Sequence, residues 1–360
     1  MTLALCMIVK NEEAVLARCL QSVHGVFDEI VIADTGSTDA TKQVAARFTQ
    51  NVYDFPWQDD FAAARNFSFS KAHADYIMWL DADDVLKERD RAALLRLKES
   101  FDGTVDAYRL RYDAGEDEYG NVTLWFIRER IVRRACGFLW QGAVHETLCI
   151  GGNVQDVAIA VTHRRGEHKE RGRNLRIYLR MLLAGKTPRG REAFYFAREL
   201  ADNGLDSAAA DAYSYFLRGE GWAEDKIGAC LGLAQIRRRQ GDTNGRRAAL
   251  LQSFCYGEPR PAVCCELGQL FLEQNEPRQA VFWFKLAYNE GLHGQGDGFV
   301  CPDCGGYLPC IWLCVCYDRL RDTERAALWN ERAGSYKPQD ASYLHNKRYF
   351  ETLKNKGKTT

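Results

Sequence analysis

The sequence predicts an α/β domain with a mostly parallel sheet, followed by an all-helical domain. Two patterns support this fold class. Short apolar runs alternate with segments of helical spacing up to residue 84, which is typical of β-α-β units. From Asn174 onward the spacing is helical, with a repeat near the tetratricopeptide length of about 34 residues. We therefore expect two domains, at residues 1–170 and 171–360.

The first part of the chain contains four predicted strands separated by three predicted helices. The strands are Leu3–Val9, Glu29–Ala33, Val52–Phe55 and Asp75–Leu80, and the helices are Ala14–Val23, Asp39–Phe48 and Asp60–Ala74. Right-handed crossovers place the carboxyl ends of such strands on one edge of the sheet. Polar clusters follow three of these strand ends, so we expect one site built from Lys10–Glu12, Asp34–Gly36 and Asp81–Asp83.

The motif Asp81-Ala82-Asp83 is the most informative of the three. It directly follows the apolar run Tyr76–Leu80, so two carboxylates leave a buried strand and point at one place. Carboxylate oxygens are ligands that Mg²⁺ and Mn²⁺ prefer, and we expect the motif to hold one of these ions. The alternative is an acidic loop in which Asp84 caps the next helix.

Asp34 is the second candidate, because its carboxylate can accept hydrogen bonds from a base or a ribose. The alternative is that the segment Gly36–Asp39 only begins a helix, which accounts for its capping side chains but leaves Asp34 unexplained. Glu12 is a weaker candidate, since the run Asn11–Glu13 also begins an ordinary helix with favourable dipole charge.

Four segments of the chain together carry a family resemblance. They are Met7–Glu13, Val31–Thr41, Asp60–Asn66 and Trp79–Asp84. In this order they resemble the family 2 glycosyltransferases, in particular the subgroup with tetratricopeptide-like helices after the catalytic domain. The resemblance implies a Rossmann-like GT-A fold, a nucleotide-diphosphate sugar donor such as a UDP-sugar, Mn²⁺ or Mg²⁺, and inversion at the anomeric carbon.

The resemblance also implies roles for single residues. Glu12 and Asp34 would bind the nucleoside, and Arg65 would lie near the base or the diphosphate. Asp83 would be the main metal ligand, with Asp81 beside it.

The acceptor side is expected between Ala107 and His163. The segment Phe138–Glu146 resembles the His-Glu motif of the subgroup. Glu146 is our first choice for the base that removes the acceptor proton, and His145 is the second; a structural hydrogen bond is the alternative for His145. Trp140 could stack on a sugar ring or pack in the core.

His163 ends an apolar strand and is a candidate third metal ligand, because imidazole beside carboxylates suits Mn²⁺. Several basic residues follow it, and they could brace the leaving diphosphate or form a solvated loop. They are Arg164, Arg165, Lys169, Arg171 and Arg173.

The second part of the chain contains four predicted turns between helices. They are Asn203-Gly204, Gln240-Gly241, Gln274-Asn275 and Leu320-Arg321, and the second members are 37, 34 and 46 residues apart. Five positions after each turn stand Ala209, Arg246, Ala280 and Ala326, where small residues would let paired helices approach closely. Helical arrays bind peptides or other chains, so we expect this domain to serve an acceptor peptide, protein or glycan, or a homodimer.

The composition argues against other classes. The 48 basic and 49 acidic residues leave a net charge of −1, which gives no argument for nucleic acid. We expect no transmembrane helix and no signal peptide, and 13 cysteines fit a reducing, cytoplasmic location. Cys301 and Cys304 have zinc-ligand spacing, but a structural site needs four ligands, and the nearest candidates, Cys310, Cys314 and Cys316, are expected in the core.

Two other functions are alternatives to a metal-dependent glycosyltransferase. A non-catalytic helical-repeat scaffold or peptide-binding protein would carry a degenerate sheet domain, whereas Asp34, Asp83 and Glu146 are all present. A nucleotidyltransferase would usually show a glycine-rich basic loop after the first strand, and Lys10–Glu13 is not such a loop.

Overall fold

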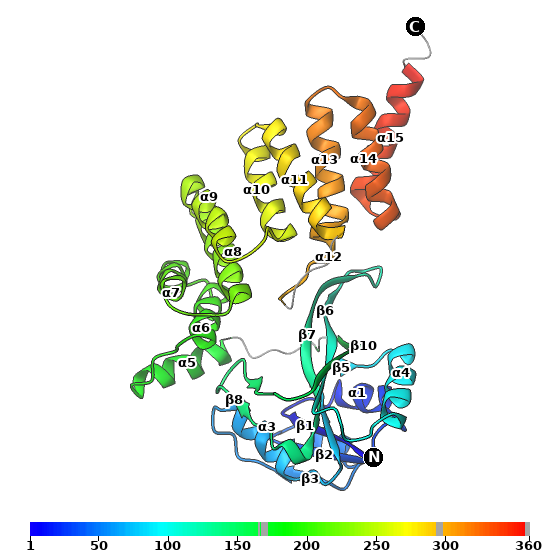
Figure 1. The fold of residues 1–360 in the computed structure, drawn as a ribbon, viewed down its shortest axis with the longest axis vertical. Coiled ribbons are helices and arrows are strands. Elements are labelled where there is room, and N and C mark those ends of the chain that lie inside the picture. The colour runs from blue at the N-terminus through cyan, green and yellow to red at the C-terminus, as the bar shows by residue number, and fades with distance from the viewer. Residues whose placement is uncertain (165, 167–171, 293–297, 357–360) are drawn as a thin grey trace. The chain divides into compact units, whose positions relative to one another are not determined.

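The computed structural model describes residues 1–164, 166, 172–292 and 298–356. The chain divides into two compact units, Met1–Pro188 (unit 1) and Arg189–Thr360 (unit 2) (Figure 1). The domain boundary that we predicted between residues 170 and 171 lies outside the described residues. Among the described residues, no helix has the length and apolar content to cross a membrane.

Unit 1 is built on an eight-stranded sheet with the order β3-β2-β1-β4-β7-β6-β10-β5. Strands β1 to β4 are mutually parallel wherever they pair, as the alternating pattern predicted. Strand β7 is antiparallel to β4 and to β6, while β10 is parallel to β6 and antiparallel to β5. The bounds are β1 Leu3–Val9, β2 Glu29–Asp34, β3 Val52–Asp54, β4 Tyr76–Trp79, β5 Asp84–Val85, β6 Ala107–Glu116, β7 Val122–Arg133 and β10 Val154–His163.

Helices cover both faces of this sheet (Figure 1). Alternate residues of β1 face opposite sides, so Leu5 and Met7 join one apolar core and Cys6 joins the other. Helices α1, α2 and α4 supply buried residues to the first core, while α3 and a small two-stranded sheet (β8, β9) supply the second. The bounds are α1 Leu16–Ser22, α2 Thr41–Ala45, α3 Phe61–Ser70, α4 Glu88–Glu99, α5 Arg173–Leu183, β8 Trp140–Gln141 and β9 Thr147–Leu148. This doubly covered, mostly parallel sheet confirms the predicted α/β fold class.

Unit 2 is helical and confirms the predicted tetratricopeptide-like domain. Its helices pack as consecutive pairs, α6 with α7, α8 with α9, α10 with α11, and α13 with α14. The bounds are α6 Arg191–Asp202, α7 Asp206–Arg218, α8 Ala223–Arg239, α9 Thr243–Gln252, α10 Pro261–Glu273, α11 Pro277–Leu292, α12 Pro302–Gly305, α13 Tyr307–Arg319, α14 Thr323–Tyr336 and α15 Ala341–Lys356.

The four turns predicted from the sequence each connect the two helices of one pair. Each contains one residue of positive φ, and the amide of the next residue bonds to the carbonyl five positions earlier, which is the Schellman geometry. The positive-φ residues are Gly204, Gly241, Asn275 and Arg321, and the bonds run from Leu205 to Leu200, Asp242 to Arg237, Glu276 to Phe271 and Asp322 to Tyr317.

The positions five residues after these turns are all buried. Ala209, Ala280 and Ala326 are small, as close helix pairing requires. Arg246 is large and instead forms ion pairs with Glu266 and Glu273 of α10.

Candidate active site at the carboxyl edge of the sheet

Asp34 ends β2, and its two carboxylate oxygens have different surroundings. Oδ1 accepts hydrogen bonds from the amides of Gly36 (2.9 Å) and Ser37 (2.8 Å), which fixes the turn. Oδ2 is buried and has no hydrogen-bond partner within the described part of the chain. A buried, unpaired carboxylate oxygen is costly, so Oδ2 is suited to accept a hydrogen bond from a ligand. The turn therefore accounts for one oxygen of Asp34 and not for the other.

The loops that follow β1 and β2 are bonded to each other. Asn11 accepts a hydrogen bond from the amide of Thr38 (2.8 Å), and the amide of Glu12 donates to Oγ1 of Thr41 (2.7 Å). The Glu12 carboxyl group faces the acidic motif. Burial, and then the negative charges of Asp83 and Asp81, raise the pKa of Glu12 to about 7. Glu12 therefore belongs to a cluster of carboxylates at this edge.

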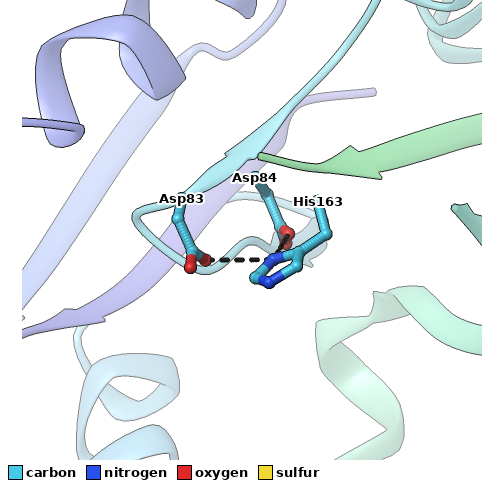
Figure 2. Close-up of side chains that lie close together, drawn as sticks. All are labelled: Asp83, Asp84 and His163. Atoms are coloured by element: carbon cyan, nitrogen blue, oxygen red, sulfur yellow. Dashed lines mark ion pairs between the residues drawn. The ribbon is translucent and has the colours of Figure 1, made fainter. Parts of the chain in front are cut away.

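Asp83, Asp84 and His163 form the metal-ligand cluster of the described residues (Figure 2). Nδ1 of His163 lies 3.4 Å from Oδ1 of Asp83 and 3.8 Å from Oδ1 of Asp84. The antiparallel pairing of β5 with β10 produces this arrangement, because it places His163 opposite Asp84. Two carboxylates and one imidazole nitrogen match the donor set that Mn²⁺ accepts, and Nδ1 is buried without a hydrogen bond to any described residue.

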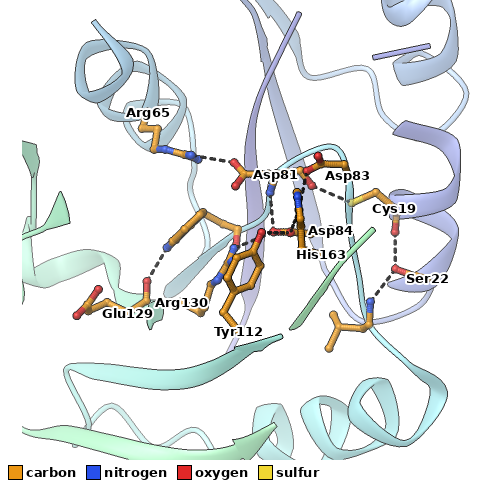
Figure 3. A network of polar contacts seen from close by, with 12 residues as sticks. Cys19, Ser22, Arg65, Asp81, Asp83, Asp84, Tyr112, Glu129, Arg130 and His163 are labelled. Atoms are coloured by element: carbon orange, nitrogen blue, oxygen red, sulfur yellow. Dashed lines mark hydrogen bonds and ion pairs between the residues drawn. The ribbon is translucent and has the colours of Figure 1, made fainter. Parts of the chain in front are cut away.

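The two acidic residues on either side of Asp83 each have an arginine partner (Figure 3). Asp81 pairs with Arg65 at 2.8 Å, and Asp84 pairs with Arg130 at 3.0 Å. No arginine or lysine ion pair is found for Asp83 in the ranges that the structure describes. Asp83 thus differs from Asp81 and Asp84 in having no arginine partner among the described residues, and its ion-pair partner there is the imidazole of His163.

The charges around these groups shift their titration. Burial raises the pKa of Asp81, but Arg65, Arg130 and Arg128 outweigh it and bring the pKa to about 2. Burial lowers the pKa of His163, but the neighbouring carboxylates outweigh it and bring the pKa to about 9. Without a metal ion, the imidazole is therefore protonated at neutral pH.

Asp84 is buried at the centre of a hydrogen-bond network. Its Oδ2 accepts from the amide of Asp81 (3.0 Å) and from Arg130, and its Oδ1 accepts from the hydroxyl of Tyr112 (2.9 Å). It does not cap α4, whose N-cap residue is Lys87. Neither Arg130 nor Tyr112 was among the residues expected at this site. The available signal was a charged residue, Arg130, directly before the apolar end of β7.

Helix α1 supports the same loop from the other side. The thiol of Cys19 donates to the carbonyl of Asp81 (3.5 Å), and the hydroxyl of Ser22 accepts from the amide of Leu86 (3.1 Å) (Figure 3). The acidic loop is thus held at both of its ends.

Glu146 lies in the turn between β8 and β9, and its Oε1 accepts a hydrogen bond from Nε of Arg65 (2.6 Å). The structure therefore connects Glu146, through Arg65, to Asp81. His145, the second candidate base, has a φ of 52°, which is a strained conformation for a histidine. Trp140 is 2% exposed and packs edge-on against Trp79, with ring centroids 4.9 Å apart. The structure thus places Trp140 in the core behind Arg65.

The basic segment after His163 is only partly described. Arg165, Lys169 and Arg171 lie outside the described residues. The carbonyl of Arg164 accepts a hydrogen bond from Arg18, and the guanidinium of Arg173 lies 4.7 Å from the ring centre of Phe61.

The sulfur atoms of Cys301 and Cys304 lie 2.6 Å apart in unit 2. No third metal-ligating side chain gathers with them in the part of the chain that the structure covers. Cys310, Cys314 and Cys316 are buried in the helical core.

Comparisons with known proteins bear on both units. Residues 4–150 match the family model described as glycosyl transferase family 2. A TPR repeat-containing protein of Synechococcus elongatus is 30% identical over 267 residues, covering 73% of this chain and 59% of that protein. The SPbeta prophage-derived glycosyltransferase SunS of Bacillus subtilis is 30% identical over 104 residues, covering 27% of this chain and 23% of that protein.

Among solved structures, the crystal structure of MamA is 15% identical and covers 44% of this chain and 84% of that chain, with a TM-score of 0.37. The match to this chain spans less than two thirds of the length of the Synechococcus elongatus protein and of SunS. The matched range 4–150 contains Asp34, Arg65, Asp83 and Glu146. The amino-terminal unit of this chain therefore contains, at residues 4–150, a domain that matches glycosyl transferase family 2.

Proposed function

We propose that this chain is a metal-dependent, inverting glycosyltransferase. It transfers a sugar from a nucleotide-diphosphate sugar, with a UDP-sugar as the expected donor, to a peptide, protein or glycan acceptor. The observation that carries the proposal is that an unpaired acceptor atom, Oδ2 of Asp34, and a metal-ligand cluster around Asp83 share one edge of the sheet.

The nucleoside end of the donor is assigned to Asp34. Its Oδ2 would accept a hydrogen bond from the base or a ribose hydroxyl, while Oδ1 keeps the turn in place. Gly36, with a φ of 104°, has open space where a side chain would begin, so a ligand can approach the backbone there.

The diphosphate end is assigned to Asp83 and His163, with Asp84 behind them. These side chains would hold Mn²⁺ or Mg²⁺, which supplies charge neutralisation for the leaving diphosphate when it is bound. Arg130 compensates the charge of the fully buried Asp84 and so keeps the imidazole of His163 and Asp83 in place. Glu12 adds a further carboxylate to the rim of this site.

The acceptor end is assigned to Glu146, with His145 as the alternative. Glu146 would take the proton of the acceptor as the new glycosidic bond forms on the face opposite the leaving group. The ion pair with Arg65 is compatible with this role, because an ionised carboxylate has lone pairs on two oxygens and Arg65 occupies one of them.

The helical unit is assigned to acceptor binding. Paired-helix arrays present extended surfaces. A relative whose similarity covers 73% of this chain is named a TPR repeat-containing protein. The homodimer through this unit stays a prediction.

The proposal is tested by incubating the protein with a panel of nucleotide sugars and Mn²⁺, without an acceptor, and measuring hydrolysis of each. The expected result is metal-dependent hydrolysis of one donor, abolished by Asp83→Asn and unaffected by Asp211→Asn, an exposed aspartate of α7. If the protein neither binds nor hydrolyses any of these donors, with or without Mn²⁺, the non-catalytic scaffold is favoured instead.

A further inference from the structure

Arg65 connects two parts of the candidate site that are far apart in the sequence. Its Nη2 donates to Oδ1 of Asp81 (2.8 Å), at the end of the central strand β4. Its Nε donates to Oε1 of Glu146 (2.6 Å), in the β8–β9 turn. One planar guanidinium therefore holds a carboxylate of the metal side and the candidate base of the acceptor side at a fixed separation.

The surroundings of Arg65 leave this guanidinium little freedom. The residue is 6% exposed, and its guanidinium carbon lies 4.6 Å from the ring centre of Trp79 and 4.8 Å from that of Trp140. Stacking on aromatic rings combined with two charge-assisted hydrogen bonds is a rigid arrangement. A change of rotamer at Arg65 would have to break both ion pairs.

The neighbouring residue fastens the same two elements. The side chain of Asn66 accepts a hydrogen bond from the amide of Trp140 (2.9 Å) and donates one to its carbonyl (3.0 Å). The amide of Phe61 donates to the carbonyl of Ala143 (2.9 Å), at the start of the same helix. Helix α3 thus holds the segment before Glu146 at two points, Trp140 and Ala143.

We propose that Arg65 is a positioning residue that sets the distance between the metal side and the base, and that it does not bind the donor diphosphate. This inference rests on the proposed function. It differs from the role that the family resemblance implied for Arg65, because the two hydrogen-bonding groups described above are directed at carboxylates of the protein.

The test is Arg65→Lys. Lysine keeps the positive charge but is a point donor, so it cannot hold two carboxylates in one plane. Transfer to the acceptor should fall by about 10²-fold in kcat, the usual effect of misplacing a reacting group by about 1 Å. The KM for the donor and its Mn²⁺-dependent binding measured by calorimetry should both be unchanged. Arg239→Lys is the matched control, since Arg239 forms a two-bond ion pair with Asp206 in unit 2.

A double variant tests whether Arg65 acts through Glu146. In the Glu146→Gln background, Arg65→Lys should lower kcat little further, because the group that it positions has already lost its function. Asn66→Ala should reproduce the pattern of Arg65→Lys in weaker form, and it decides the question if Arg65→Lys does not fold.

The outcomes are distinct. A loss of donor affinity that parallels the loss of kcat would assign Arg65 to the diphosphate and overturn the inference. Unchanged transfer in both Arg65→Lys and Asn66→Ala would also overturn it. Failure of the proposed function is separate, because the wild-type protein itself would then neither bind nor hydrolyse a nucleotide sugar.

Discussion

Replacing Asp34 with asparagine changes one atom of the site and leaves the backbone turn intact. The amides of Gly36 and Ser37 require an acceptor at the position of Oδ1, so the amide oxygen of the new side chain must occupy it. The amide nitrogen then replaces Oδ2, the buried atom that has no partner in the described part of the chain. A hydrogen-bond donor of the protein thus replaces the acceptor to which the ligand is expected to donate a hydrogen bond.

The expected magnitude follows from the geometry. A hydrogen bond to a charged group contributes about 1.5–3 kcal/mol, so Asp34→Asn should weaken binding of the nucleoside diphosphate by about 10- to 150-fold. The melting temperature without ligand should stay the same or rise, because the buried oxygen that has no hydrogen-bond partner among the described residues is removed. Titration calorimetry with UDP and Mn²⁺ gives the affinity, and scanning calorimetry gives the stability.

Asp39→Asn provides the opposite control. Both oxygens of Asp39 are occupied within the protein: Oδ1 accepts from the amide of Thr41 (3.0 Å), and Oδ2 accepts from the amide of Glu13 (3.2 Å). This variant should lose stability and keep its affinity for UDP. If Asp34→Asn also lost stability and kept its affinity, Asp34 would be a turn residue only, and its Oδ2 would have no part in binding the nucleoside.

Three further predictions concern the metal side and the base. Asp83→Asn should remove the Mn²⁺ dependence of UDP binding without lowering the melting temperature; retained Mn²⁺-dependent binding in calorimetry would place the ion elsewhere. Burial and the charges of Asp83 and Asp81 raise the pKa of Glu12 to about 7. Protonation of Glu12 therefore favours the folded state, and this stabilisation is present at low pH and lost as the pH rises through about 7. In the presence of a chelator, Glu12→Gln should therefore be more stable than the wild type at pH 8, by at most about 3 kcal/mol before solvent screening is considered. At pH 5 the two proteins should differ little in stability. Equal melting curves at both pH values would contradict the placement of Glu12 beside Asp81 and Asp83. Glu146→Gln should lower turnover by about 10²–10⁴-fold with little change in donor affinity, measured as steady-state kinetics beside calorimetry, and a matching loss of donor affinity would move Glu146 to the donor side.

The sequence predicted the parts of the fold that depend on local pattern. Apolar runs located β1, β2 and β4 to within about two residues, and Asn275 and Arg321 marked turns as reliably as the two glycines did. These features depend on side-chain periodicity and on the conformational needs of a single residue, both of which are visible in a short window. The grouping of strand ends at one edge followed from the handedness of β-α-β units, and needed no contact information.

The pairing of charges could not be obtained in this way. Arg65 and Glu146 are 81 positions apart, and Arg130 and Asp84 are 46 positions apart. The first pair depends on the packing of helix α3 against the β8–β9 turn, and the second depends on the antiparallel pairing of β7 with β4; no local pattern in the sequence predicts either of them. The sequence therefore identified acidic residues around Asp83, but not how the protein divides its arginines among them.

The repeated turn geometry of unit 2 has a consequence for how the whole chain unfolds. Each helix pair closes on its own local turn and packs mainly on its immediate neighbours, so the free energy of this unit is close to a sum over pairs and their interfaces. Such arrays lose structure stepwise from their ends, while the sheet of unit 1 shares cores that span all of its central strands. Heating should therefore give several overlapping transitions, with the helices of unit 2 exchanging their amide hydrogens before the central strand β1 does.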